Sequence, residues 1–350
     1  HLGVRRQRQM CIRDRVSTSL IASDKLDTNS YFFFFKHLIY VLIGISLIFI
    51  FSSFNSDQLY KYSIFLFFIS LISLFLVPFV GVEVKGSKRW IDLFFLPRFQ
   101  PIEVLKPFLI IILATIFCDI RSNILFKYLI SIILISVISL LLIAQPDIGQ
   151  TLLVVFCWAV LIFTSGINIY ILLAIFIAGA SLLTYLIIYV PRFDYIQGRI
   201  FSFFNRETGT HNFQSDKAIE SITSGGFFGK GIGEGVLKNR VPEAHTDYII
   251  SVISEEFGVV AIMLILLLFL ILIYMVFKKI SFETNDKVKL ILIGSISLIL
   301  MQATIHIGVN IRLFPTTGMT LPFLSYGGSS IISTSILAGI ILNLTKRKIT

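Results

Sequence analysis

The chain has 350 residues, a mean hydropathy of +0.88 and a formal net charge of +10, and only 14% of its residues are charged. A soluble domain of average composition, in which about a quarter of the residues are charged, is therefore excluded. Apolar runs of roughly 17 to 25 residues recur, the length that crosses about 30 Å of hydrocarbon, and the alternating segments of a membrane β-barrel are not found in the sequence. The sequence predicts an all-α fold, a polytopic transmembrane helical bundle.

The first fifteen residues, HLGVRRQRQMCIRDR, carry five arginines against one Asp and so hold +4 of the net charge. They lack the apolar h-region of a signal peptide. They are either a basic arm for nucleic acid or a membrane surface, or a foreign stub left by cloning or assembly. We favour the stub, residues 1–15, which leaves residues 16–350 as one transmembrane domain.

The apolar runs predict nine spanning helices, and no internal repeat or separable soluble domain is evident. Pro101 and Pro146 lie where predicted helices begin or end, as a residue without an N–H allows. The longest connection, 191–247, far exceeds ordinary loop lengths, and its aromatic and Gly content argues against disorder. The predicted helices cover about 33–53, 61–80, 101–118, 128–145, 149–166, 169–190, 248–277, 289–309 and 326–344.

Two cationic segments, 278–289 and 345–348, are two helices apart and therefore lie on the same side of the membrane, which the positive-inside rule makes cytoplasmic. By parity, the connections 81–100, 191–247 and 310–325 face outward. These connections are nonetheless rich in Lys and Arg, which predicts an anionic ligand on the outer face. For any single one of these cations, a solvated loop charge near lipid headgroups is an equally good interpretation.

The first outward connection, VKGSKRWIDLFFLPRFQPIEVLK (84–106), places Lys88 and Arg89 before a helix that begins at a Pro. Glu103 and Lys106 follow in the first turn of that helix at spacing i, i+3, so they can pair on one face. A charge at the bilayer centre costs about 2.5–3.5 kcal/mol, and less near the interface. The two residues form either a structural ion pair or part of a functional site.

Asp147, in IAQPDIGQTLL (143–153), lies between two predicted helices at an outward junction. Asp is a favoured residue at the N-cap of a helix. A capping role and a role in a polar site are equally good interpretations.

Neither a nucleotide loop nor a metal cluster is indicated. The run SGGFFGKGIGEG (224–235) lacks the preceding strand of a dinucleotide loop and the Ser or Thr that follows Lys in a Walker sequence. We interpret it as a tightly bent surface loop near a ligand. Cys11, Cys118 and Cys157 are scattered and predict neither a disulfide framework nor a metal site.

The stretch VPEAHTDYIISVISEEFG (241–258) leads into the apolar run VVAIMLILLLFLILIYMVF. If the helix begins near residue 246, four polar residues recur on one broad face, with Asp247 and Glu255 about 12 Å apart along the axis. Glu255 and Glu256 then lie inside the membrane zone, where ionisable groups are functional candidates, and Asp247 lies at its rim. Capping explains Asp247 but neither glutamate. The four polar residues are Asp247, Ser251, Ser254 and Glu255.

The last outward segment, HIGVNIRLFPTTGMTLPFLSYGGSS (306–330), contains Asn310, Arg312 and the sequence Ser325-Tyr326-Gly327-Gly328. Irregular backbone at membrane depth is tolerated where it is buried in protein or lines a cavity, and the Gly and Pro residues here let the chain dip inward. Four polar segments are thus predicted to converge on one membrane face.

Six segments follow one another along the chain: KGSKRWIDL, RFQPIEVLK, QPDIG, FQSDKAIESITSGGFFGKGIGEG, VPEAHTDYIISVISEEFG and GMTLPFLSYGGSS. In this order they resemble the shape, elongation, division and sporulation (SEDS) family of integral membrane proteins, and the resemblance covers nearly all of residues 16–344. Ala244 and Thr320 are more similar to the division branch of the family, FtsW, than to the elongation branch, RodA.

The resemblance implies ten helices, one more than the nine predicted, with VSTS (16–19) as the outer end of a first helix that is otherwise missing. The chain is thus expected to be an N-terminally truncated member of the family. Gln150 stands where Thr is usual, and Phe213 stands where Tyr is common. Neither departure is expected to touch the chemistry.

The resemblance also implies an enzyme, a peptidoglycan glycosyltransferase that polymerises lipid II at the outer face of the cytoplasmic membrane during cell division. The acceptor 4-hydroxyl attacks the donor's anomeric carbon and expels undecaprenyl pyrophosphate with inversion. Asp247 matches the family's essential carboxylate and is expected to be the general base or to orient the acceptor.

The other site residues implied by the resemblance serve the substrate. Charge-assisted hydrogen bonds are expected to hold the pyrophosphate, and those cations are Arg89, Lys106 and Arg199. Glu103 is expected to orient Lys106, and Asp147 and Glu255 to shape the cavity. The remaining substrate-binding candidates are Lys88, His245 and Ser325.

The implied partners are lipid II, a class B penicillin-binding protein that acts as transpeptidase, and other membrane proteins of the divisome, with no nucleic acid. The implied location is the inner membrane at the division septum. No cofactor is predicted, and the sequence leaves open whether a divalent cation takes part.

Two other functions compete with the polymerase. A lipid II flippase needs polar residues through the full depth of the membrane, whereas here they crowd its outer third. A scaffold that only recruits a transpeptidase predicts that Asp247→Asn is harmless.

Overall fold

The computed structural model describes residues 32–84, 87–93, 96–119, 123–190, 193–204, 210–235, 244 and 246–346. The basic stub and the remnant of a first helix predicted from the sequence lie outside these residues. The chain divides into two compact units. The first unit holds the chain up to Leu42, Gly198–Leu272 and Ala303–Gly327, and the second holds Ile43–Gln197, Ile273–Gln302 and the chain from Gly328 onward.

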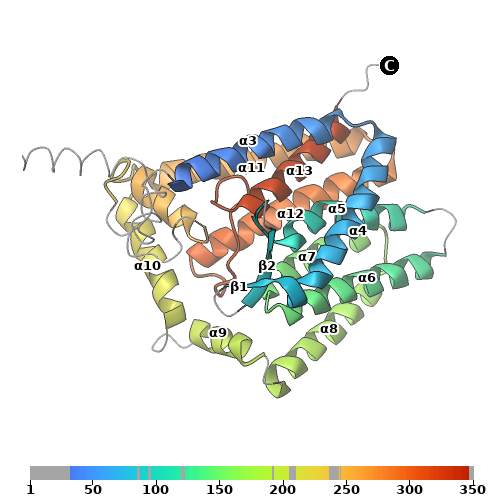
Figure 1. Cartoon of the computed structure of the whole chain (residues 1–350), viewed down its shortest axis with the longest axis horizontal. Coiled ribbons are helices and arrows are strands. Elements are labelled where there is room, and N and C mark those ends of the chain that lie inside the picture. The colour runs from blue at the N-terminus through green and yellow to red at the C-terminus, as the bar shows by residue number, and fades with distance from the viewer. Residues whose placement is uncertain are drawn as a thin grey trace, which may run out of the picture. The chain divides into compact units, whose positions relative to one another are not determined.

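Nine helices of the described chain correspond to the nine predicted spanning segments (Figure 1). Seven of these are long and apolar enough to cross a membrane, whereas α5 and α7 have 17 residues each. The predicted polytopic all-α fold is confirmed. The nine helices are α3 (Phe32–Ser53), α4 (Ser56–Val80), α5 (Pro101–Phe117), α6 (Ile124–Ala144), α7 (Ile148–Thr164), α8 (Ile169–Tyr189), α11 (Ile249–Phe282), α12 (Asp286–Asn310) and α13 (Gly328–Thr345).

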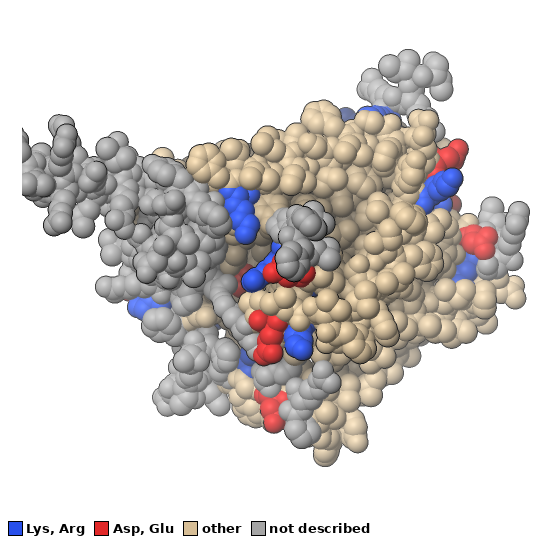
Figure 2. All heavy atoms as spheres, viewed as in Figure 1, with Lys and Arg blue, Asp and Glu red and all other residues tan. Residues whose placement is uncertain are grey.

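The helix α5 forms the centre of the second unit. It contacts α4, α6, α7, α13 and the strand β2 (Ser87–Leu93), and most of its residues are buried. The helix α8, in contrast, is almost entirely exposed, and Leu172 is its one buried residue. Figure 2 shows that uncharged residues dominate the face in view and that charged residues gather in a few small groups, as a lipid-facing surface requires.

A small antiparallel sheet occupies the connection between α4 and α5, where the sequence predicts no strand. The strands β1 (Val82–Val84), β2 and β3 (Leu96–Phe99) lie in the order β1-β2-β3. They have three to seven residues each, too few for alternation to stand out against the neighbouring apolar helices. The register shifts once in each of the two strand pairings, between Val82 and Glu83 and between Ile91 and Leu93.

Two helices lie within the connection 191–247, for which the sequence predicts one long loop: α9 (Asp194–Phe204) and α10 (Thr210–Gly225). The described buried face of α10 has helical spacing, but its members are small or polar, so hydrophobic periodicity did not reveal it. That face consists of Ser215, Ala218, Ser221 and Gly225.

The helix α11 was predicted as one uninterrupted span over 248–277, and this was wrong in two respects. It extends to Phe282, and it is broken at Gly258, where φ is 76° and ψ is −174°. The left-handed φ favours glycine at this position. Polar backbone groups freed by the break need partners inside the protein. The glycine-rich loop supplies these partners. It donates to two carbonyls before the break, from Lys230 N to Glu255 O (2.9 Å) and from Gly231 N to Glu256 O (3.0 Å). It accepts from two N–H groups after the break, from Val259 N to Gly226 O (3.0 Å) and from Val260 N to Phe227 O (3.2 Å).

Close packing against the break explains the glycines of this loop. A Cβ on Gly225 would lie 1.9 Å from Ser254 O, and a Cβ on Gly229 would lie 2.2 Å from Glu256 O. Both distances are far below van der Waals contact, and the obstacle is backbone. The loop is tightly bent, as predicted, because it pairs with the broken helix.

The end of α3 is held by a side chain of α13. Asn343 Nδ2 donates to Phe51 O (2.9 Å) and to Phe54 O (2.6 Å), two carbonyl groups at or beyond the last turn of α3.

Replacing Asn343 with Leu should lower the free energy of unfolding by about 1–3 kcal/mol, because the half-buried carbonyls lose their donor. Thermal melting of the detergent-solubilised protein measures the loss. The neighbouring change Leu342→Ala, on an exposed position, is the control, and an equal effect of both changes would contradict the capping role.

Candidate active site

Arg89 and Asp147 form the first polar group of the second unit. Arg89 Nη1 lies 3.7 Å from Asp147 Oδ1, and Arg89 Nε donates to Gln145 O (3.1 Å). Asp147 also accepts from Gln150 N (3.3 Å), so the predicted N-cap of α7 is present, and from Gln100 Nε2 (2.8 Å). Burial raises the pKa of the Asp147 carboxyl, and the Arg89 guanidinium opposes that rise. Asp147 therefore caps a helix and neutralises a cation at once.

Glu103 and Lys106 form the second polar group, and the i, i+3 pair expected from the sequence is present. Lys106 Nζ lies 2.9 Å from Glu103 Oε2, and the two side chains are 1% and 4% exposed respectively. Each charge compensates the other in a place where either alone would be costly. Both residues lie in the first turns of the central helix α5.

Gln150, which was expected not to touch the chemistry, joins these two polar groups. Its Nε2 donates to Glu103 Oε1 (2.6 Å), and its Oε1 accepts from Lys106 Nζ (3.0 Å). Gln150 stands three residues after the N-cap Asp147, a position from which Gln or Glu commonly folds back on the cap. Here the side chain reaches α5 instead. The spacing could have drawn attention to Gln150, but it could not give this direction.

Lys88 and Arg89 diverge although they are neighbours in sequence. They are consecutive residues of β2, where its pairing with β1 shifts in register, and their side chains differ in burial. Arg89 turns to the α6–α7 junction and is partly buried, whereas Lys88 is exposed. The structure therefore does not bring Lys88 into the polar network of the other four predicted residues of this unit.

Asp247 belongs to the first unit, where its backbone is held from two sides. It lies just before α11 and is half-buried. Ser325 Oγ donates to Thr246 O (2.8 Å), and Asn310 Nδ2 donates to Asp247 O (3.0 Å). Ser325 Oγ also accepts from Leu321 N (2.8 Å). The hydroxyl of Ser325, predicted to bind substrate, is thus engaged with backbone and positions the aspartate.

The loop 316–319 meets both Asp247 and Arg199. A Cβ on Gly318 would lie 3.5 Å from Asp247 Oδ2, and Arg199 Nη1 donates to Thr316 O (3.2 Å). Burial raises the pKa of the adjacent Tyr248 phenol, the charge of Asp247 raises it further, and Arg199 opposes both. The Asp247 carboxylate and the Arg199 guanidinium therefore both lie beside this short loop, and Gly318 brings no side chain against the carboxylate.

Glu255 ties three segments of the first unit together. Its side chain is fully buried, Oε2 accepts from Ser221 Oγ (2.9 Å) of α10, and Oε1 lies 3.6 Å from Lys230 Nζ of the glycine-rich loop. The predicted helical stripe from Asp247 to Glu255 is wrong at its start, because α11 begins only at Ile249. His245, another predicted site residue, lies outside the described residues.

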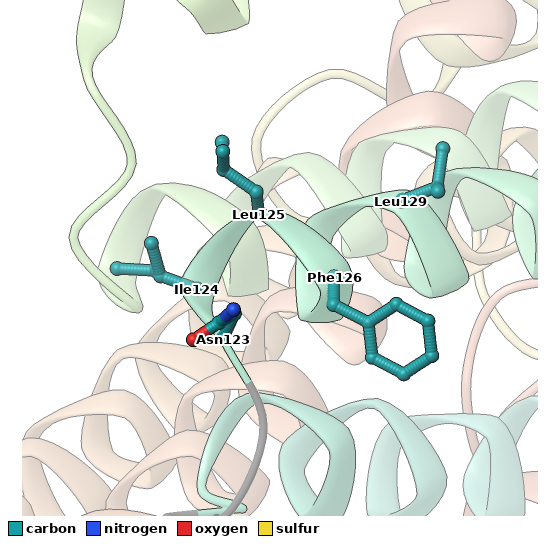
Figure 3. Close-up of a pocket in the computed structure, with 5 residues that line it drawn as sticks. All are labelled: Asn123, Ile124, Leu125, Phe126 and Leu129. Carbon is teal, nitrogen blue, oxygen red and sulfur yellow. The ribbon is translucent and has the colours of Figure 1, made fainter.

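No group of three or more His, Cys, Asp or Glu side chains could hold a metal ion in the described part of the chain. A hollow on the second unit is lined by the start of α6, with Asn123 as its one polar residue (Figure 3). Its lining holds no ionisable group and none of the predicted site residues. The remaining lining residues are Ile124, Leu125, Phe126 and Leu129.

Comparison with known proteins agrees with this architecture. The sequence model of a family described as cell cycle protein, covering FtsW, RodA and SpoVE, matches residues 15–349. The probable peptidoglycan glycosyltransferase FtsW of Caulobacter vibrioides is 30% identical over 95% of this chain and 84% of its own length. The protein of the same name from Coxiella burnetii is 32% identical over 94% of this chain and 90% of its own length.

Solved structures are similar as well. The rod shape determining protein RodA of Thermus thermophilus superposes with a TM-score of 0.66 at 28% identity, over 89% of this chain and 86% of that one. A chain from work on "polymerization and crosslinking by a peptidoglycan synthase complex" gives a TM-score of 0.76 at 27% identity, over 89% of each chain.

The buried pair on α5 makes a prediction for stability. Lys106→Met should destabilise the protein by about 3–5 kcal/mol, because it leaves the Glu103 carboxylate without its partner in a buried site. Adding Glu103→Gln to Lys106→Met should restore part of that loss. Melting temperatures of the parent, both single variants and the double variant measure the coupling. If the two losses simply add, the charges do not act as a pair.

Proposed function

The chain belongs to the FtsW, RodA and SpoVE family of cell cycle proteins, and from this membership we propose that it is a peptidoglycan glycosyltransferase that polymerises lipid II. Two relatives that carry this activity in their names are 30% and 32% identical to it over nearly the whole chain. The chain is a multi-pass membrane protein with seven described helices able to cross a bilayer. We place its active site at the outer face of the bacterial inner membrane.

One observation carries the assignment of residues: the Asp247 carboxylate and the Arg199 guanidinium lie on the same loop, 316–319. The acceptor's 4-hydroxyl gives its proton to Asp247 as its oxygen attacks the donor's anomeric carbon. The bond from that carbon to the diphosphate oxygen breaks, and the leaving group takes the electron pair. Arg199 neutralises the charge that develops on the diphosphate.

The buried network of the second unit has a supporting role in this proposal. Arg89 and Lys106 are already engaged, Arg89 by Asp147 and Lys106 by Glu103 and Gln150. We assign them to the shape and charge of the substrate-binding region. We assign Arg199 to the leaving diphosphate because it lies beside the same loop as Asp247. Lys88, exposed on β2, and His245 remain candidates for contact with the headgroup of the substrate.

The proposed partner is a class B penicillin-binding protein, the transpeptidase that would crosslink the new strands. The solved synthase complex similar to this chain couples polymerization and crosslinking, which supports a partner of that kind. The FtsW relatives favour a place at the division septum, together with other membrane proteins of the divisome.

Replacing Asp247 with Asn should abolish glycan synthesis, because the amide cannot accept the proton of the acceptor hydroxyl. The assay gives fluorescent lipid II to the purified chain with its transpeptidase in liposomes and follows strands by gel electrophoresis. Asp286→Asn, at an exposed position at the start of α12, is the control and should polymerise normally. Equal synthesis by both variants would exclude Asp247 as the base. Transbilayer movement of lipid II without polymer from the parent would indicate a flippase, and neither activity would indicate a scaffold.

Ser325→Ala should lower kcat about tenfold, equivalent to about 1.4 kcal/mol, with little change in KM. The change leaves the Asp247 side chain in place but removes the hydrogen bond that holds the preceding carbonyl. Initial rates over a range of lipid II concentrations separate the two constants. Ser333→Ala, which removes a buried hydroxyl of α13, is the matched control, and a rise in KM alone at Ser325 would favour direct substrate binding.

A further inference from the structure

The glycine-rich loop carries an exposed apolar tip that the proposed catalysis does not use. Phe227 is 75% exposed, Phe228 is 85% exposed and Ile232 is 57% exposed. Two neighbouring phenylalanine rings left in water would be unfavourable, and contiguous exposed apolar groups mark contact with a membrane or a partner. The exposure of this tip therefore needs an explanation outside the unit itself.

Backbone pairing fixes the position of the tip along α11. Val260 N donates to Phe227 O (3.2 Å) and Val259 N donates to Gly226 O (3.0 Å), so the tip lies beside the first residues after the break at Gly258. Val259 and Val260 are themselves exposed, 41% and 52%. The apolar surface of the loop is thus continuous with the exposed apolar surface of a membrane-spanning helix.

The length of the apolar run sets the depth of this position in the bilayer. Residues 259–277 are apolar without interruption and are followed by Lys278 and Lys279. As a helix this run covers about 28 Å, close to the thickness of the hydrocarbon core. If the two lysines mark one boundary of the core, Gly258 marks the other. Phe227 and Phe228 then lie at the interface, where aromatic side chains are favoured.

The polar groups of the loop fit the same depth. Several of its backbone groups are already hydrogen-bonded, among them Gly229 N to Gly225 O (2.9 Å), Lys230 N to Glu255 O (2.9 Å) and Gly231 N to Glu256 O (3.0 Å). Pairing of this kind lowers the cost of leaving water. The side chain of Lys230, 38% exposed, pairs with the buried Glu255 and can keep its charge near the headgroups.

We propose that the loop 226–232 is a membrane anchor, which inserts Phe227 and Phe228 between the acyl chains and headgroups of the leaflet at this end of α11. The occupant of the apolar surface is lipid. The anchor fixes the height of the broken helix relative to the bilayer. Since Ser221 of α10 donates to Glu255, which pairs with Lys230 of the loop, the anchor also fixes the height of α10.

The test adds one tryptophan to the loop and asks what quenches it. Phe228→Trp and, separately, Phe227→Trp are introduced into the full chain in liposomes, and the emission of the unsubstituted chain, from Trp90 and Trp158, is subtracted. Lipids brominated at carbons near the headgroup or deep in the acyl chain report depth, and aqueous iodide reports exposure to water. We expect strong quenching by the shallow bromines, weaker quenching by the deep ones and little by iodide.

Two matched positions calibrate the result. Leu264→Trp, exposed within the apolar run of α11, should respond to the deep bromines, and Glu220→Trp, exposed on the polar helix α10, should respond to iodide. Melting curves verify that each variant is folded, and agreement of the two loop variants guards against a local distortion. If the loop tryptophans respond to iodide like Glu220→Trp, the tip lies in water and the proposal fails. If neither quencher reaches them, protein covers the tip, and the proposal fails equally.

Discussion

The constraint that governs this protein is the absence of water in the hydrocarbon core, where every polar group must find its partner inside the chain. The buried ion pair between Glu103 and Lys106 on α5 satisfies it with side chains, at 2.9 Å and with Gln150 bonded to both. The break in α11, at the edge of the core, satisfies it with backbone, because a glycine-rich loop supplies the missing partners of four groups. The ion pair and the backbone pairing differ in chemistry but have the same effect. Each fixes a local structure, because moving its groups apart would leave polar groups unpaired at a high cost in free energy.

Such fixed structures suit a site that must stabilise charge in a membrane. Asp247 is placed by its own backbone, with Ser325 and Asn310 holding two successive carbonyls. The backbone that carries its carboxylate is therefore held in place by two side chains of the same unit. Electrostatic catalysis depends on this kind of arrangement, in which the dipoles are in place before the reaction begins.

Much of this could be predicted from sequence where a single strong signal decided the structure. Nine apolar runs gave nine helices, the spacing of Glu103 and Lys106 gave an ion pair, and Asp147 before an apolar run gave an N-cap. Each rests on local chemistry. The buried face of α10 could not be predicted because it is made of small and polar residues. The sheet before α5 could not be predicted because its strands are short.

Other features depend on contacts between distant segments, which local signals do not carry. The role of Gln150 depends on the contact between α7 and α5, through which its side chain reaches Glu103. The break at Gly258 depends on hydrogen bonds to the loop 225–235. The hydrophobic periodicity of a single helix predicts neither the contact of Gln150 nor the break at Gly258.

The junction between the glycine-rich loop and the broken helix has a consequence for how the protein can vary. Gly225 and Gly229 leave no room for a Cβ against the backbone of residues 254–256, and Gly258 would drive one into Phe227 O at 2.2 Å. Neither side can change shape alone. In a chimaera between two family members, residues 225–235 and 254–260 would therefore have to come from the same parent, although residues 236–253 separate them in the sequence.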